Sequence, residues 1–105
     1  MKSNLITVDN FKCTCCGQMP KVSKRLLKIL NDIQKDIGEN LTILSPKCSD
    51  PEFRKMLKAC VILAPKTYSV DDLADLAILH NADGIRRLYR YKAVYLDVLG
   101  NKMDF

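Results

Sequence analysis

The C-terminal third of this chain, residues 69–100, restricts its fold more than any other stretch. It reads SVDDLADLAILHNADGIRRLYRYKAVYLDVLG. Ser69 is a favoured helix N-cap, and Asp72 stands three residues later in a capping-box-like position. Apolar residues then recur at three- and four-residue steps, which predicts a helix that ends near His80. Two short strands are predicted after it, at 85–88 and 93–98, joined by a basic and aromatic turn.

The last of these strands carries the candidate functional residues Tyr95 and Asp97. Side chains two residues apart on a strand share a face, so the two are expected to point the same way. A structural role is the competing interpretation, in which Tyr95 is a sheet-face aromatic and Asp97 pairs with a neighbouring Lys or Arg.

Upstream, residues 20–38 form an apolar stripe with helical spacing, and Gly38 is placed to end that helix in a left-handed cap. Residues 41–44 are rich in β-formers and predict a strand. A short helix is predicted next, capped by Ser49 or Asp50, with Pro51 in its first turn and an apolar side made of Phe53, Met56 and Leu57. The apolar run at 59–64 predicts a central strand that is buried on both faces.

These elements predict a small α+β domain. At 105 residues the chain is long enough for one modest core, and its 48% apolar and 28% charged residues are typical of a soluble globular protein. We expect one domain over 1–105, with an extended lead-in at 1–10 and the folded unit at 11–100. About three helices would pack on a mainly antiparallel sheet made of 41–44, 60–64, 85–88 and 93–98.

The formal charge of +5 is moderate, and its Lys and Arg residues are scattered. Scattered basic residues are typical of a solvated surface, so we expect no nucleic-acid partner. No apolar run approaches the roughly 20 residues of a membrane helix, and the N-terminus lacks the apolar length of a signal peptide. We therefore expect no membrane association, and a cytoplasmic or phage-associated location.

Five cysteines allow three interpretations. Cys13, Cys15 and Cys16 are close enough to begin a zinc site, but no second close pair of Cys or His residues exists to complete it. A disulfide from one of these three to Cys48 is an alternative. The simplest interpretation is a set of buried or half-buried thiols, because free cysteine packs like a small apolar residue.

The residues needed for hydrolysis are largely missing. His80 is the single histidine, and its place near a helix C-terminus is favoured by the helix dipole without any catalytic role. A cysteine or serine nucleophile would need a base beside it, and nothing in the spacing brings His80 to one. We therefore predict no catalytic residues and no cofactor.

Several segments together resemble the zinc D-alanyl-D-alanine carboxypeptidase-like peptidases of the Hedgehog/DD-peptidase fold, especially their small phage and bacterial form. The similar segments span roughly residues 5–100. They are the turn FKCTCCG at 11–17, the loop SPKC at 45–48, the segment ADGI at 82–85 and the strand VYLDV at 94–98. In the family the loop reads Ser-Gly-Tyr-Arg-Cys and the strand reads Val-His-x-Asp-Val. The resemblance implies the family's fold and a cleft for cell-wall peptide.

The family binds zinc through the His and Asp of an H-x6-D segment and a second His on the last strand. A gapless alignment places the first His near Lys55 and the Asp near Ile62, and the second His position holds Tyr95. A catalytic zinc needs three protein ligands, and a tyrosine phenol stays protonated near neutral pH. The resemblance therefore implies a peptidase-like domain that has lost its metal site.

We interpret the chain as a catalytically inactive member of this family that acts by binding. Its partner would be a cell-wall peptide or a phage or bacterial protein, and the vestigial cleft would be lined or bordered by Lys47, Tyr89, Tyr91, Tyr95 and Asp97. A second hypothesis is a cysteine-based redox or metal-binding module that uses Cys13, Cys15, Cys16 and Cys48. An active zinc peptidase with altered ligands is the third.

Overall fold

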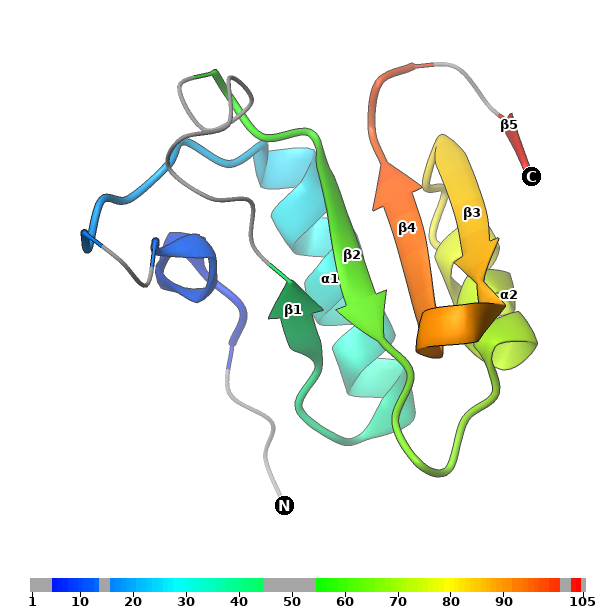
Figure 1. Ribbon diagram of the computed structural model, residues 1–105. Coiled ribbons are helices and arrows are strands. Elements are labelled where there is room, and N and C mark those ends of the chain that lie inside the picture. The colour runs from blue at the N-terminus through cyan, green and yellow to red at the C-terminus, as the bar shows by residue number, and fades with distance from the viewer. Residues whose placement is uncertain (1–4, 14–15, 45–54, 101–102, 105) are drawn as a thin grey trace.

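The computed structural model describes residues 5–13, 16–44, 55–100 and 103–104. Two α-helices, α1 (Lys24–Ile37) and α2 (Val70–Leu79), lie on the same face of a single sheet in this part of the chain (Figure 1). The strands are β1 (Thr42–Leu44), β2 (Ala59–Leu63), β3 (Gly84–Leu88), β4 (Ala93–Asp97) and β5 (Met103–Asp104). The predicted α+β class is confirmed.

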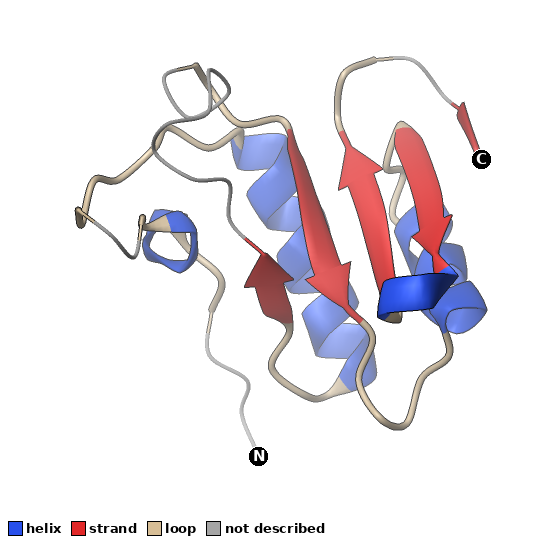
Figure 2. Cartoon of the chain, viewed as in Figure 1, coloured by secondary structure: helices blue, strands red, loops and turns tan. Residues whose placement is uncertain are grey.

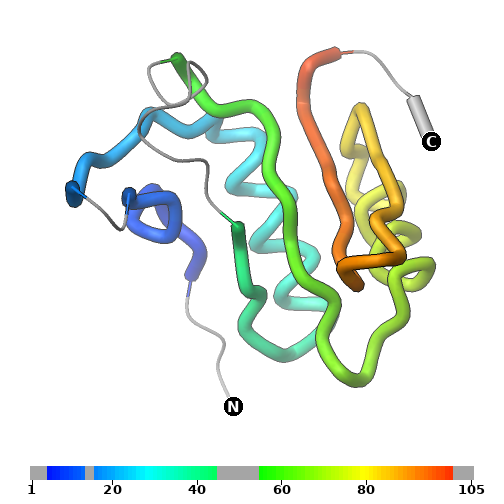
Figure 3. Tube along the Cα trace, viewed as in Figure 1, coloured from blue at the N-terminus to red at the C-terminus, as the bar shows by residue number. Residues whose placement is uncertain are grey.

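The sheet has the strand order β1-β2-β4-β3-β5. The first four strands are antiparallel to their neighbours, as predicted, and β5 adds two residues parallel to β3 (Figure 2). The N-terminal 3₁₀ helix η1 (Val8–Phe11) contacts β1, so the two ends of the described chain lie at opposite edges of the sheet (Figure 3).

Helix α1 forms where the apolar stripe predicts it, but it begins later than residue 20. Its buried side chains include Leu26, Ile29, Leu30 and Ile33, and Gly38 ends it in the left-handed conformation, with φ of 79°. The residues before it are extended, because Val22 forms a parallel bridge with Leu57. The backbone N–H of Ser23 donates to the Leu57 carbonyl at 2.9 Å, a bond that a helical backbone there would lose.

The short helix predicted after Ser49 falls largely on residues 45–54, which lie outside the described part of the chain. Its described continuation, at 55–58, is not helical. There Leu57 is buried and pairs with Val22, so its apolar character serves the main core. Among the described residues there are two α-helices, and a third is not found.

The extended lead-in predicted at 1–10 is described from residue 5, and it ends in the turn of η1. The Thr7 hydroxyl accepts from the Asp9 backbone N–H, and the Asn10 side chain accepts from the Thr7 N–H, which together favour a 3₁₀ turn. Ile6 and Phe11 on either side of this cap are buried in the core. The segment therefore packs onto the domain.

The predicted cap of α2 is confirmed, because the Ser69 hydroxyl accepts from the Asp72 backbone N–H at 3.0 Å. After α2, strands β3 and β4 form a hairpin through the 3₁₀ helix η3 (Tyr89–Tyr91). Lys92 follows with φ of 49°, in the left-handed region, and turns the chain into β4.

The two faces of the sheet differ in burial. Cys60 and Ile62 of β2 and Val94 and Leu96 of β4 are buried in the core beneath the helices. The alternate positions project to the other face: those of β2, including Val61, are only partly buried, and in β4 Tyr95 is partly buried between the buried Ala93 and Asp97. The prediction that the β2 strand is buried on both faces is therefore wrong for this face, over which the described residues place no α-helix.

Candidate functional site

Tyr95 and Asp97 share a face of β4, as their spacing predicts. The Tyr95 hydroxyl donates to Asp97 Oδ2 across 2.7 Å. Tyr95 is partly buried, whereas Asp97 is 7% exposed. The pair is therefore coupled, with the tyrosine at the surface and the carboxylate behind it.

The Asp97 carboxylate is held by the backbone as well as by Tyr95. Its Oδ1 accepts from the Gly84 N–H at 2.9 Å and from the Leu99 N–H at 3.2 Å. A side chain at position 84 would collide with this carboxylate, since a Cβ built there lies 2.7 Å from Asp97 Cγ and closer still to Oδ2. Asp97 thus joins the start of β3 to the end of β4, and its carboxylate oxygens accept hydrogen bonds from groups of the protein itself.

A second buried carboxylate, that of Asp83, precedes the first residue of β3. Asp83 is 4% exposed, and the Arg25 guanidinium donates two 3.0 Å hydrogen bonds to its carboxylate. The Gly100 N–H donates to the same carboxylate at 2.8 Å, and the Asp83 N–H donates to the Asp97 carbonyl. This cluster, from α1, β3 and the end of β4, is a structural joint that the sequence analysis missed, because Arg25 and Asp83 lie 58 residues apart.

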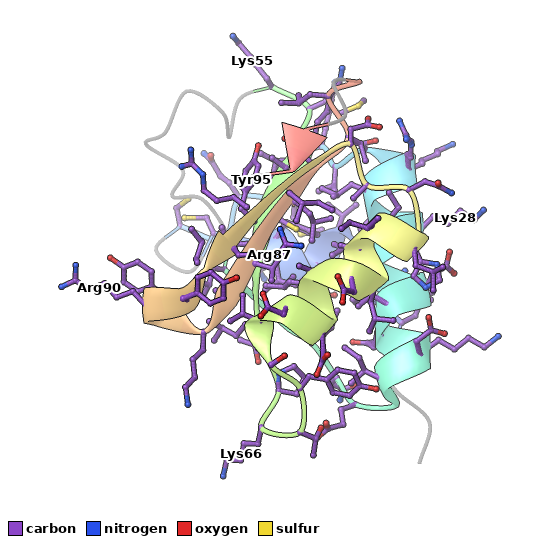
Figure 4. The ribbon with its side chains drawn as sticks, turned by 90° about the vertical axis from the view of Figure 1, so that its right-hand side faces the viewer. Lys28, Lys55, Lys66, Arg87, Arg90 and Tyr95 are labelled. Atoms are coloured by element: carbon purple, nitrogen blue, oxygen red, sulfur yellow. The ribbon has the colours of Figure 1, made fainter. Side chains whose placement is uncertain are left out.

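A groove of about 720 Å³ opens beside Tyr95 on the sheet face without an α-helix. We call it the Tyr95 groove. Its apolar lining includes Val61 and the exposed side chains Leu44, Met56 and Leu99. Lys55 and Lys58 also line it, and no acidic residue does so among its described lining. Figure 4 shows Lys55 extending from the chain near one end of the molecule, beyond Tyr95. The lining therefore suits a ligand that is partly apolar and carries negative charge.

Sheet register shows which residues of β2 share the face of Tyr95. Val61 of β2 is the direct cross-strand partner of Tyr95. Ile62, where the gapless alignment puts the family's Asp, is fully buried on the opposite face and pairs with Val94. Ile62 therefore does not share the face of Tyr95, whereas Val61 does and lines the groove with it.

The residues present do not fit a zinc ion. Valine offers no ligand atom, and the Tyr95 phenol already donates its proton to Asp97. Lys55, near which the gapless alignment places the family's first His, is exposed and lines the groove. Among the residues that are described, no group of three or more His, Cys, Asp or Glu side chains is arranged to hold a metal ion.

The other candidate binding residues lie away from this pair or outside the description. Tyr91 is exposed in η3, at the opposite end of β4 from Asp97, roughly 20 Å along the strand. Tyr89 is also exposed there, and its hydroxyl donates to Asp71 of α2 at 2.6 Å. Lys47 lies outside the described residues. Of the predicted set, the structure brings together Tyr95 and Asp97.

The cysteines do not form one cluster in the described chain. Cys13 and Cys60 are buried, and Cys16 is exposed. Burial raises the pKa of the Cys60 thiol to about 12, so this thiol is inert at neutral pH. Cys15 and Cys48 lie outside the described residues, so the disulfide and metal-binding hypotheses that use them stay predictions.

His80 is the C-cap of α2, close to where the sequence predicts the helix end. Its Nε2 lies 2.6 Å from Asp36 Oδ2 in the last turns of α1. The two helices are therefore tied together at these ends, on the far side of the sheet from the Tyr95 groove.

No family model, curated protein or solved structure matches this chain. Within the described ranges, neither helix has the length and apolar character needed to cross a membrane.

Proposed function

We propose that this chain is a non-catalytic, peptidase-like domain that binds a short cell-wall peptide in the Tyr95 groove. The observation that carries the proposal is the pairing of Val61 with Tyr95 across the groove wall. In the family that the sequence resembles, ligands for zinc stand on these two strands. In this chain a valine and a phenol that donates to Asp97 stand on these strands, and a groove lies beside them.

The size and charge of the groove support a peptide ligand. A volume of about 720 Å³ is in the range of pockets that hold small molecules and short peptides. Its apolar lining suits small aliphatic side chains, and Lys55 and Lys58 favour carboxylates. Peptidoglycan stem peptides combine alanine methyl groups with several carboxylates, so their chemistry complements this surface.

Co-sedimentation with purified peptidoglycan sacculi tests the proposal. We expect the wild-type protein to sediment with the sacculi and Lys58→Glu to bind about tenfold more weakly, because the change replaces attraction for a carboxylate by repulsion. Lys28→Glu is the matched control. It makes the same change in charge on the exposed surface of α1, and Figure 4 shows Lys28 projecting from that helix on the side away from the sheet.

Two results would contradict the cell-wall ligand. If folded wild-type protein stays in the supernatant, the partner is a phage or bacterial protein instead. If Lys28→Glu weakens sedimentation as much as Lys58→Glu does, binding follows overall charge and does not use the groove.

A further inference from the structure

A second cavity lies at the other end of β4 from Asp97, and it shares no lining residue with the Tyr95 groove. It is formed by the β2–α2 loop, the first turn of α2 and η3 with the residue after it. Figure 1 shows this loop and η3 at the same end of the sheet. We call the cavity the η3 pocket. Its volume of about 380 Å³ is within the range of pockets that hold small molecules.

Backbone hydrogen bonds hold the walls of the η3 pocket in place. The Tyr68 N–H donates to the Pro65 carbonyl at 3.1 Å, which closes the loop into a turn. The Ala64 N–H donates to the Lys92 carbonyl at 2.8 Å, and this bond joins the loop to the residue that follows η3. The folded backbone therefore forms the pocket before any ligand binds, which lowers the entropic cost of binding.

Two tyrosines, Tyr68 and Tyr89, line the η3 pocket together with Pro65. Tyr89 is 61% exposed, yet its hydroxyl donates to Asp71 Oδ1 at 2.6 Å. The Arg87 Nε lies 3.4 Å from the same oxygen. These contacts restrict the orientation of a ring that would otherwise be free in solvent. Such a ring offers a large apolar surface to a ligand at little further entropic cost.

The charge of this lining is positive once the contacts of Asp71 are counted. Asp71 is the acidic residue of the described lining, and its carboxylate already contacts Arg87 and Tyr89. Lys66 and Lys92 also line the pocket, and within the described part of the chain neither forms an ion pair. Figure 4 shows Lys66 extending from the loop into solvent. An exposed lysine changes rotamer within nanoseconds, so its ammonium group can turn to an anion at the pocket.

We propose that the η3 pocket binds a small molecule that combines a planar ring with an anionic group. The two tyrosines and Pro65 supply apolar surface for the ring, and the two lysines attract a carboxylate or a phosphate. An aromatic carboxylic acid and a mononucleotide are the two sources of this chemistry. The site is separate from the Tyr95 groove, so it does not depend on the proposed function.

An NMR titration of the full, ¹⁵N-labelled chain tests this proposal with two pairs of probes. The first pair is 2-naphthoate and its neutral analogue 2-naphthamide. We expect 2-naphthoate to bind with a Kd on the order of 1 mM and to shift the amide signals of Tyr68, Val70 and Lys92. The neutral amide should bind about tenfold more weakly, because it lacks the charge that the lysines attract.

The second pair, adenosine monophosphate and adenosine, distinguishes the two sources of the anion. Adenosine monophosphate that binds more tightly than 2-naphthoate identifies a phosphate ligand, and the reverse order identifies an aromatic carboxylate. In either case the proposal requires that the charged member of each pair that binds does so more tightly than its neutral member.

Matched variants locate the binding of 2-naphthoate. In Lys66→Gln/Lys92→Gln the acid and the amide should bind within about twofold of each other, whereas Lys28→Gln/Lys35→Gln, on the exposed surface of α1, should keep the tenfold difference. Tyr89→Ala should weaken 2-naphthoate about tenfold. Tyr91→Ala, a similarly exposed tyrosine of η3 that does not line the pocket, should leave its Kd unchanged.

Several results would overturn the η3 pocket as a binding site. Equal binding of 2-naphthoate and 2-naphthamide removes the role of the lysines, and an equal effect of the two lysine pairs means that binding follows overall charge. Shifts that gather at Val61 and Leu99 place the probe in the Tyr95 groove instead. A wild type whose spectrum no probe changes also overturns the proposal. The dispersion of the amide spectrum shows that each variant is folded.

Discussion

Asp97 and Gly84 make a contact that admits no side chain larger than hydrogen at position 84. The Gly84 N–H donates to the Asp97 carboxylate, and an added Cβ would overlap that carboxylate. The glycine of the ADGI segment at 82–85 is required by a side chain from the neighbouring strand, a contact that leaves no signal in the local sequence.

Gly84→Ala should therefore destabilise the domain strongly. We expect a loss of roughly 3 kcal/mol or more in the free energy of unfolding, because the buried carboxylate must move away from two backbone donors. Gly38→Ala is the matched control: its φ of 79° is strained for alanine, but its surroundings are open, so about 1 kcal/mol is expected. Urea unfolding measures both, and equal losses would contradict the collision at Gly84.

Cys60 should be protected from thiol reagents in the folded protein. Burial raises its pKa from 9.0 to about 12, so at pH 8 almost none of it is thiolate. The folded pKa lies above the unfolded one, so the associated stability is complete below pH 9 and is lost as the pH rises from 9 toward 12. Peptide mapping after iodoacetamide treatment at pH 8 should show labelled Cys16 and unlabelled Cys60.

Labelling of Cys60 at a rate similar to that of Cys16, in protein that remains folded, would contradict this burial. In urea both residues should react with iodoacetamide, which shows that each thiol can be labelled once the protein is unfolded.

At the scale of elements, periodicity and capping predicted what local sequence determines. The stripe in α1, the Gly38 cap, the Ser69 cap and the β3–β4 hairpin all follow from residues close in sequence. The start of α1 was not predicted, because Val22 is extended and forms a β-bridge with Leu57, which lies 35 positions away in the sequence. The Arg25–Asp83 joint was missed for the same reason, since pairing between distant segments leaves no local signal.

The groove wall formed by β2 and β4 gives a test of register. Cross-strand partners hold their Cβ atoms about 5 Å apart, so Val61→His/Tyr95→His should bind zinc between two imidazoles. At a zinc concentration 100 times Kd, we expect a stabilisation of about 2.7 kcal/mol, seen as a higher Tm.

The two single variants are the controls, and each should show little response to zinc at the same concentration. A double variant that behaves like them would mean that residues 61 and 95 do not face each other.

At the scale of the whole molecule, the residues that stabilise the sheet and the residues that line the groove lie in different places. Both α-helices and the carboxylates of Asp83 and Asp97 hold the sheet, while the Tyr95 groove lies on the face that the helices leave open. The sequence was sufficient for the fold class and for placing Tyr95 beside Asp97. It was insufficient for the groove, which is lined by side chains from β1, β2, β4 and the segments around them.

Calorimetric titration of the stem pentapeptide into the wild-type protein, in chelator and again in zinc, tests the central proposal most directly. The proposal of a binding domain without a metal predicts saturable binding with the same Kd in both buffers, because neither Val61 nor Tyr95 supplies a zinc ligand. Binding that occurs only in zinc, or no binding in either buffer, would contradict it.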